Sequence, residues 1–197
     1  GDKATGKTDK NGEVTVPEVE RTEHHSAYVV GYTDGTFGPE RNMTRSEAAA
    51  IFARLLADKN GGNISPVAKT KFSDVPAYAW YSGYVKYLNN NGVTYGNSKT
   101  NFAPDKQITR AEFTTLAVRF FDVYGDGDAE IMEQFKSFDD VSDGYWAAEY
   151  IKAAAKHGWI TGYGDGSFRA DRQITRAEVM TIVNRLLGRA ADLEYVS

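Results

Sequence analysis

A five-residue motif returns three times along the chain at a nearly constant spacing, and this repeat constrains the fold more than any other feature. It reads MTRSE at 43–47 and ITRAE at both 108–112 and 174–178, so its arginines lie 65 and 66 residues apart. Glycine, phenylalanine and a second arginine also recur at fixed offsets from this TRxE motif. A period of this length indicates one supersecondary unit arranged in tandem. The sequence therefore predicts three related units.

An amphipathic pattern follows every copy of the motif. Apolar residues recur one, four and five positions apart, which places them on a single stripe of a helix. The stripes consist of Ile51, Phe52, Leu55 and Leu56, then Leu116, Ala117, Phe120 and Phe121, then Ile182, Val183, Leu186 and Leu187. Three equivalent stripes predict three helices that pack on a shared axis.

A second block precedes the motif in the later two units only. It begins with Phe-x-Asp-Val at Phe72 and at Phe138, and it continues to Trp80 and Trp146, each of which opens a helical pattern. The first unit has no counterpart of this block. We therefore expect either a second copy of the chain, forming a homodimer, or a downstream segment to complete the first unit.

Each complete unit reads as a helix that ends at Gly92 or Gly158, a glycine-rich crossing segment, and a second helix that begins at the motif. Residues 1–23 are charged or small, which is typical of a flexible leader. We divide the chain into this leader, a first unit holding only its second half (24–60), a second unit (61–125), a third unit (126–190) and a tail (191–197).

The threonine and glutamate of each motif have a structural explanation. Thr-x-x-Glu in front of an apolar helix is a capping box, in which the hydroxyl accepts from a backbone N–H and the glutamate accepts from the cap residue. We expect this capping role for Thr44 with Glu47, Thr109 with Glu112, and Thr175 with Glu178.

The arginine of each motif is not explained by capping. Arg45, Arg110 and Arg176 occupy the first helical position, where the helix dipole disfavours a positive charge. A guanidinium beside free helix N–H groups makes an anion site suited to a carboxylate. The alternative is a structural salt bridge to an aspartate of a neighbouring unit. The residues alone leave both readings open.

The crossing segments favour a sugar ligand. GYTDGTF (31–37) and GYGDGSF (162–168) combine tyrosines, aspartates and exposed backbone donors, which can stack on sugar rings and bind hydroxyl groups. The middle segment, YGNSKTNF (95–102), carries Lys99 in place of the aspartate, so we expect its loop to differ in shape.

The aromatic residues of the repeats also have a plain interpretation, since recurring aromatics usually form a core. On that reading Phe37, Phe102, Phe168, Trp80 and Trp146 are buried.

Together these motifs resemble the S-layer homology (SLH) domain of bacterial cell-surface proteins. The third unit, FDDVSDGYWAAEYIKAAAKHGWITGYGDGSFRADRQITRAE, is similar to the family pattern almost throughout, with Ala170 where proline is usual. The second unit matches at both ends and departs at 95–100, and the first matches from Val30 onward. The resemblance covers roughly residues 28–188.

The resemblance implies a mainly α fold, with helix–loop–helix units in a pseudo-threefold arrangement around a central three-helix bundle. It implies a non-catalytic anchor that binds secondary cell-wall polysaccharide, through a pyruvylated sugar, in grooves between units. It implies an extracellular location, at the bacterial cell surface or cell wall. The implied carboxylate ligands are Arg45, Arg110 and Arg176, and the implied groove walls are Gly31, Tyr32, Asp34, Gly162, Tyr163, Asp165, Trp80 and Trp146.

Composition and motif spacing argue against several other classes of function. There is no cysteine, and the net charge of -4 argues against a nucleic-acid partner. No apolar run is long enough for a membrane span. His24, His25 and His157 form no catalytic or metal pattern, and GDGD at 125–128 lacks the full spacing of a calcium loop. We expect no cofactor, no metal and no catalytic residues. The alternatives are a self-assembling lattice module and, with less support, a glycan-acting enzyme.

Overall fold

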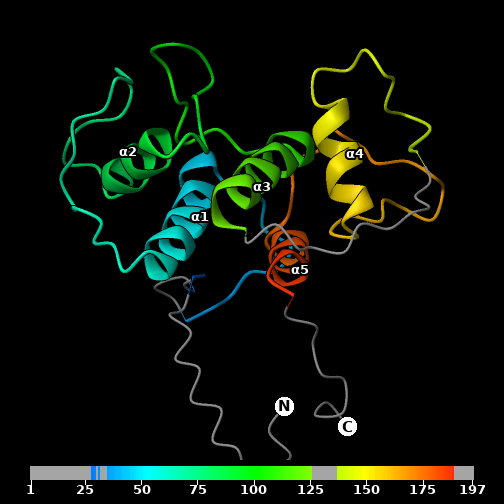
Figure 1. Ribbon diagram of the computed structural model, residues 1–197, viewed down its shortest axis with the longest axis horizontal. Coiled ribbons are helices and arrows are strands. Elements are labelled where there is room, and N and C mark those ends of the chain that lie inside the picture. Colours follow the sequence, from blue (N-terminus) through cyan, green and yellow to red (C-terminus); the bar gives the residue numbers. More distant parts are fainter. Residues whose placement is uncertain (1–27, 30, 32–34, 126–136, 189–197) are drawn as a thin grey trace, which may run out of the picture.

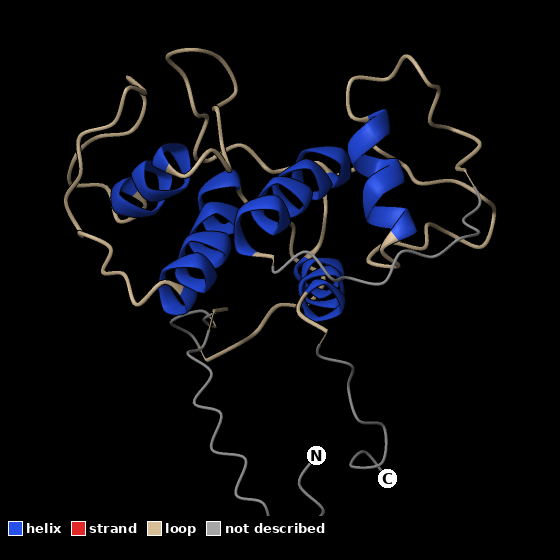
Figure 2. Cartoon of the chain, in the orientation of Figure 1, coloured by secondary structure: helices blue, strands red, loops and turns tan. Residues whose placement is uncertain are grey.

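The structure is a computed structural model that describes residues 28–29, 31, 35–125 and 137–188. This part of the chain contains five helices and no β-strand, so the mainly α fold class is confirmed (Figures 1 and 2). The helices are α1 (Arg45–Lys59), α2 (Ser82–Asn90), α3 (Arg110–Tyr124), α4 (Ala148–Lys156) and α5 (Arg176–Leu186). None of these helices combines the length and apolar character that a membrane span requires.

The three longer helices begin at the motif arginine, as the pattern predicts. Each is preceded by an extended threonine whose hydroxyl accepts from the N–H of the motif glutamate, and the glutamate accepts from the threonine N–H in return. Both bonds of the capping box are present at Thr44, Thr109 and Thr175. A cap of this kind contributes about 1 kcal/mol.

The two shorter helices begin two residues after Trp80 and Trp146. Both end in a Schellman motif whose left-handed residue is a glycine, Gly92 with φ 75° and Gly158 with φ 69°. The next residue closes the turn, because Val93 N–H donates to Leu88 O at 2.9 Å, and the equivalent bond exists in α4. The glycine stop signals in the sequence are therefore confirmed.

The helices pack so that each short helix covers a long helix of the preceding unit. Helix α2 lies against α1, α4 lies against α3, and α3 also contacts both α1 and α5 (Figure 1). No α-carbon of α1 lies within 8 Å of one in α5. The helix contacts therefore do not confirm a symmetric central bundle of three helices, and α5 has no short helix against it within the described residues.

The units are joined through the segments that lead into the long helices. Ile108 N–H donates to Met43 O at 2.9 Å, Ile174 N–H donates to Ile108 O at 3.1 Å, and Met43 N–H donates to Ile174 O at 3.1 Å. These three bonds form a closed cycle in which every unit contacts the other two. The three side chains are almost fully buried, so the cycle lies in the interior.

Aromatic rings fill the space between α1 and α3. Phe52 lies 5.2 Å from Phe113 and 4.9 Å from Phe120, measured between ring centroids, and all three are fully buried. Burial of such side chains stabilises a fold by roughly 1.5–3 kcal/mol each.

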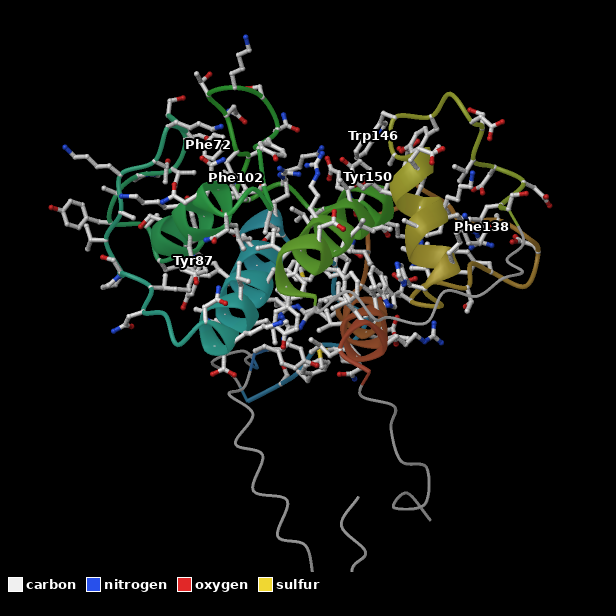
Figure 3. The ribbon with its side chains drawn as sticks, viewed as in Figure 1. Phe72, Tyr87, Phe102, Phe138, Trp146 and Tyr150 are labelled. Carbon is white, nitrogen blue, oxygen red and sulfur yellow. The ribbon has the colours of Figure 1, made fainter. Side chains whose placement is uncertain are left out.

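The Phe-x-Asp-Val block holds the crossing loop of its own unit. The ring of Phe72 packs on Phe102 at 5.7 Å, near the top left of Figure 3, and Phe138 packs on Phe168 at 5.2 Å. The carboxylate of Asp74 accepts from the N–H groups of Phe102 and Ala103, at 2.8 and 2.6 Å. The block thereby fixes a residue with φ 57°, a strained value for alanine.

The expectation that all three loop phenylalanines are core residues is wrong for the first unit. Phe102 and Phe168 are 1% and 0% exposed, whereas Phe37 is 40% exposed. The physical reason is the missing block, since no described residue takes the place of Phe72 or Phe138 over this ring. At the position of Ala103, the first unit has Gly38, which adopts φ 60° without strain.

Candidate functional site

A hollow lies at each of the three junctions between units, and each is lined by residues at equivalent positions of the repeat. We name them by one wall residue. The Trp80 groove contains Gly31, Glu47, Arg54, Trp80 and Arg176, with a volume of about 160 Å³. The Trp146 groove contains Arg45, Gly96, Glu112, Arg119 and Trp146, with about 290 Å³. The Tyr163 groove contains Arg110, Gly162, Tyr163, Glu178 and Arg185, with about 170 Å³.

The motif arginines connect neighbouring units at these junctions. Arg110 donates through Nε to Phe168 O at 2.8 Å, and its Nη1 lies 3.0 Å from Glu178 Oε1. Arg45 makes the equivalent bond to Phe102 O and lies 3.6 Å from Glu112.

Arg176 closes the set, with Nε 2.9 Å from Phe37 O and Nη1 3.9 Å from Glu47. Each motif arginine therefore meets the capping glutamate of another unit. This geometry supports a structural salt bridge between units, but the acidic partner is a capping glutamate and not the aspartate that we expected from the sequence.

The helix N–H groups beside these arginines are already used. In α3, Arg110 N–H donates to Arg172 O and Ala111 N–H donates to Ala170 O, at 2.8 and 2.9 Å. The same pairs of main-chain bonds occur at the starts of α1 and α5. The expectation of free helix N–H groups for an anion is therefore wrong, because carbonyl groups of the adjoining unit take these positions.

Burial separates the motif arginines from bulk solvent without closing them off from the grooves. Their side chains are 8%, 8% and 4% exposed for Arg45, Arg110 and Arg176. Burial lowers the pKa of the Arg45 and Arg110 guanidinium groups, although nearby glutamates offset part of this effect. An arginine stays protonated in proteins. Each of these cations therefore contributes a buried positive charge at the wall of a groove.

A second arginine lines every groove, and sequence reasoning did not assign it a role. Arg54 and Arg119 hydrogen-bond the hydroxyl groups of Tyr84 and Tyr150, at 3.3 and 3.0 Å. Arg185 donates to the carbonyl of Trp159 at 3.4 Å and has an exposed side chain. Within the part of the chain that the structure describes, none of the three has a carboxylate partner.

The signal for these arginines was present in the repeat. Each follows its motif arginine by nine residues, which is two and a half helical turns. The two arginines of one helix therefore point in opposite directions and into different grooves. In α1, for example, Arg45 lines the Trp146 groove and Arg54 lines the Trp80 groove.

Among the described lining residues, each groove therefore combines two arginines with one glutamate, an excess of one positive charge. The chain as a whole carries a net charge of -4. A cationic hollow on an acidic protein attracts a small anionic group that fits inside it. The negatively charged surface around the hollow repels larger polyanions.

The glutamate of the Tyr163 groove is the most heavily engaged. Glu178 Oε1 accepts from Arg110 Nη1 at 3.0 Å, Arg172 Nη2 at 2.7 Å and the Tyr163 hydroxyl at 2.8 Å. Burial raises the pKa of Glu178, but these bonds and the Thr175 N–H outweigh it, so the pKa lies below its ordinary value. Burial and the bond to Glu178 raise the pKa of Tyr163.

Trp80 and Trp146 are wall residues rather than core residues. They are 56% and 57% exposed, and each lines the groove named after it. Figure 3 shows Trp146 at the top of the molecule, beside Tyr150. The interpretation of these tryptophans as core is therefore wrong. Each precedes its helix and lies beside neighbouring tyrosines, Tyr81 and Tyr84 for Trp80 and Tyr145 for Trp146.

The remaining predicted wall residues divide into three groups. Gly31, Gly162 and Tyr163 line grooves. Asp165 does not, because its carboxylate accepts from Ser167 and Arg169 within its own turn, which lowers its pKa. Tyr32 and Asp34 lie outside the described residues.

The middle loop keeps the essential backbone geometry despite its different sequence. Gly96 has φ 87°, and a Cβ there would lie 2.3 Å from the Phe72 ring. The equivalent Gly162 has φ 68° and would meet Phe138 at 2.4 Å. Glycine is therefore required at both positions. Asn97 follows Gly96 into the Trp146 groove, which distinguishes this wall from the one with Tyr163.

Comparison with known proteins identifies the family of this repeat. The chain matches the S-layer homology domain family at residues 24–49, 71–114 and 137–180. It is 36% identical over 186 residues to the cellulosome-anchoring protein of Acetivibrio thermocellus, covering 93% of this chain and 40% of that protein. It is 40% identical over 173 residues to cell surface glycoprotein 1 of the same organism, covering 84% of this chain and 7% of that protein.

A third relative comes from another genus. The surface-layer 125 kDa protein of Lysinibacillus sphaericus is 32% identical over 162 residues, covering 81% of this chain and 13% of that protein. The chain thus spans less than half the length of these relatives. The family matches fall on all three repeats and include every TRxE motif, so the chain belongs to the S-layer homology domain family.

Proposed function

We propose that this chain is a non-catalytic anchor that binds an acidic cell-wall polysaccharide in its junction grooves. Membership of the family and the surface-layer and anchoring relatives indicate an extracellular location at the cell surface or wall. They also indicate an anchoring module. The identity of the ligand and the residues that hold it are our inference.

The observation that carries the proposal is the second arginine of each groove, which has no carboxylate partner among the residues that the structure describes. Arg54, Arg119 and Arg185 face hollows in which the only carboxylate among the described lining residues is already paired with a motif arginine. A guanidinium can hold a carboxylate by two parallel hydrogen bonds. A sugar that carries a carboxylate, such as a pyruvylated terminal residue, supplies this group.

The motif arginines have a supporting role in this proposal. Arg45, Arg110 and Arg176 are engaged by main-chain carbonyls and by glutamates, so they position the wall and add positive charge. A ligand carboxylate reaching their remaining N–H groups would strengthen the contact without replacing the existing bonds. Trp80 and Trp146 offer exposed ring surfaces against which a sugar ring can stack.

The test uses purified cell-wall sacculi and measures how much protein they remove from solution. Changing Arg54, Arg119 and Arg185 together to glutamine should weaken binding at least tenfold, because charge-assisted contacts contribute about 1.5–3 kcal/mol each. The matched control changes three exposed lysines away from these grooves, Lys69, Lys86 and Lys152, to glutamine, which removes the same total charge. The control should bind as the unmodified protein does.

A second arm tests the ligand chemistry. Mild acid removal of pyruvate ketals from the polysaccharide should abolish binding of the unmodified protein. If the treated wall binds equally well, the carboxylate mechanism is wrong. If the lysine control loses as much binding as the arginine variant, the attraction is general and the grooves are not the site.

A further inference from the structure

The first unit retains a complete receiving surface for a block that it lacks. In the second unit, the Phe-x-Asp-Val block makes three contacts with the crossing loop, and the third unit repeats them. The phenylalanine rings pack at a tilt, the aspartate accepts from two loop N–H groups, and the residue between them donates to a loop carbonyl. This last bond joins Ser73 N–H to Thr100 O at 2.8 Å and Asp139 N–H to Gly166 O at 3.1 Å.

The equivalent acceptors and donors in the first unit lie at 35–39. Gly35 corresponds to Thr100, Phe37 to Phe102 and Gly38 to Ala103. This loop is exposed at Phe37 and Pro39, where Phe102 and Pro104 are buried. The loop of the first unit therefore carries the equivalent ring and backbone groups, but it lacks the block that covers these groups in the second and third units.

In the described part of the chain, helix α5 has an uncovered face at the position where α1 and α3 are covered by a short helix. Short helices cover α1 and α3, whereas α5 contacts only α3 among the described helices. Thr181 of α5 is exposed, while its equivalents Ala50 and Thr115 are buried. Figure 1 shows α5 without a companion helix, in contrast to the pairs α1–α2 and α3–α4.

Within the described residues, the groove beside α5 lacks the pair of aromatic residues that lies beside the second arginine in the other two grooves. The short helices bring Trp80 and Tyr84 to one groove and Trp146 and Tyr150 to another. No described tryptophan or tyrosine occupies these two positions at Arg185.

We propose that the loop at 35–39 and the open face of α5 together form a docking site for a separate half-repeat. The partner is a peptide segment with Phe-x-Asp-Val followed by a tryptophan and an amphipathic helix. Its phenylalanine packs on Phe37, its aspartate accepts from the N–H groups of Phe37 and Gly38, and its helix covers α5. The segment is not present in this sequence in free form, because both Phe-x-Asp-Val blocks are engaged in their own units and residues 1–27 contain no Phe, Tyr or Trp.

Docking also completes the Tyr163 groove by placing a tryptophan at its wall. This consequence depends on the proposed function, whereas the docking itself does not. Peptide binding can therefore succeed even where wall binding fails.

The probe is a fluorescein-labelled peptide with the sequence of residues 137–158, titrated with the whole chain and followed by fluorescence anisotropy. We expect saturable one-to-one binding and slower hydrogen exchange at the Phe37 and Gly38 amides. Peptides carrying Phe138→Ala or Asp140→Asn should bind at least about tenfold more weakly.

The protein variants decide where the peptide binds. Phe37→Ala should weaken binding to the same extent, and because this ring is 40% exposed we expect the variant to keep its fold. Tyr78→Ala, at the exposed side chain of another loop, should bind as the unmodified chain does. Absence of saturation up to about 1 mM, which corresponds to about -4 kcal/mol of binding free energy, would overturn the proposal.

Two other results would also overturn it. One is equal binding of the altered peptides or of the Phe37→Ala protein. The other is a dimer, detected by light scattering, that excludes the peptide, because a second copy of the chain would then occupy the site.

Discussion

Arg110 reaches across a unit junction to place its Nη1 3.0 Å from the Oε1 of Glu178, while the other oxygen of that carboxylate caps α5. One glutamate thus joins a local task, capping, to a long-range task, holding two units together. Because both oxygens of this carboxylate are already hydrogen-bonded, we expect the main role of the motif to be structural, with ligand binding second. The predictions below separate the two roles.

Replacement of Arg110 by alanine should destabilise the fold. The change removes the bond to Phe168 O and an ion pair whose arginine is 8% exposed. Loss of one partner of a buried pair costs about 3–5 kcal/mol, and because Glu178 keeps Arg172 and Tyr163 we expect about 2 kcal/mol. Urea denaturation measures this loss. Arg185→Ala should stay within about 0.5 kcal/mol of the unmodified chain, as exposed substitutions do. Equal effects of the two changes would contradict the division of roles.

Stability should decrease at acid pH through Glu178. Its pKa in the folded state lies below the ordinary value, so its contribution is present above the unfolded pKa and is lost as the pH falls through the folded pKa. Glu178→Gln should therefore lower the free energy of unfolding at pH 7 and reduce its dependence on pH between roughly 5 and 2. Urea denaturation at several pH values measures both effects. If the free energy of unfolding of the variant fell with acid pH as steeply as that of the unmodified chain, other carboxylates would dominate the pH dependence.

Glycine at position 103 should be tolerated or stabilising. Ala103 has φ 57°, and the left-handed conformation costs a residue with a Cβ about 1 kcal/mol or more. Ala103→Gly should therefore raise the unfolding free energy by about 0.5 kcal/mol, after the entropic cost of glycine is subtracted. The control is Ala153→Gly within α4, which should lower it by about 1 kcal/mol. If both changes destabilise equally, the strain assigned to Ala103 is absent.

Removal of an exposed groove tryptophan should affect wall binding much more than stability. Trp80→Ala leaves a surface position and should cost at most about 1 kcal/mol, measured by thermal or urea unfolding. The buried Trp159 provides the contrast, since its change to alanine should cost about 3–5 kcal/mol. Under the proposed function, Trp80→Ala also removes less than the whole of sacculus binding, because the Trp146 groove remains. Full binding by a Trp80→Ala, Trp146→Ala double variant would exclude a stacking role.

Local signals allowed the sequence to predict the elements of this fold. The capping boxes, the glycine stops at Gly92 and Gly158 and the apolar stripes each act within a few residues, and all are found in the structure. What the sequence did not specify is which units meet. The pairing of Arg45 with Glu112 joins residues of different units, and nothing in the local pattern selects that partner.

The aromatic residues show why the candidate site was harder to predict. Phe37 and Phe102 occupy the same place in the repeat, yet only Phe102 has a ring above it. The exposure of the loop phenylalanine therefore depends on whether its unit contains the Phe-x-Asp-Val block. The absence of this block from the first unit was a signal that Phe37 would be exposed. The second arginines recur at a fixed position of the repeat. Which groove each one enters follows only from the number of helical turns that separate it from the motif arginine.

The cycle of main-chain bonds through Met43, Ile108 and Ile174 limits how this architecture can change in evolution. In an open array of repeats, an extra copy adds at an end and a lost copy shortens the row. A ring has no ends, so inserting or deleting one whole copy would require every unit to meet its neighbours at a different angle before the cycle could close. A further copy of the module is therefore easier to accommodate as a second complete ring than as a fourth member of the first.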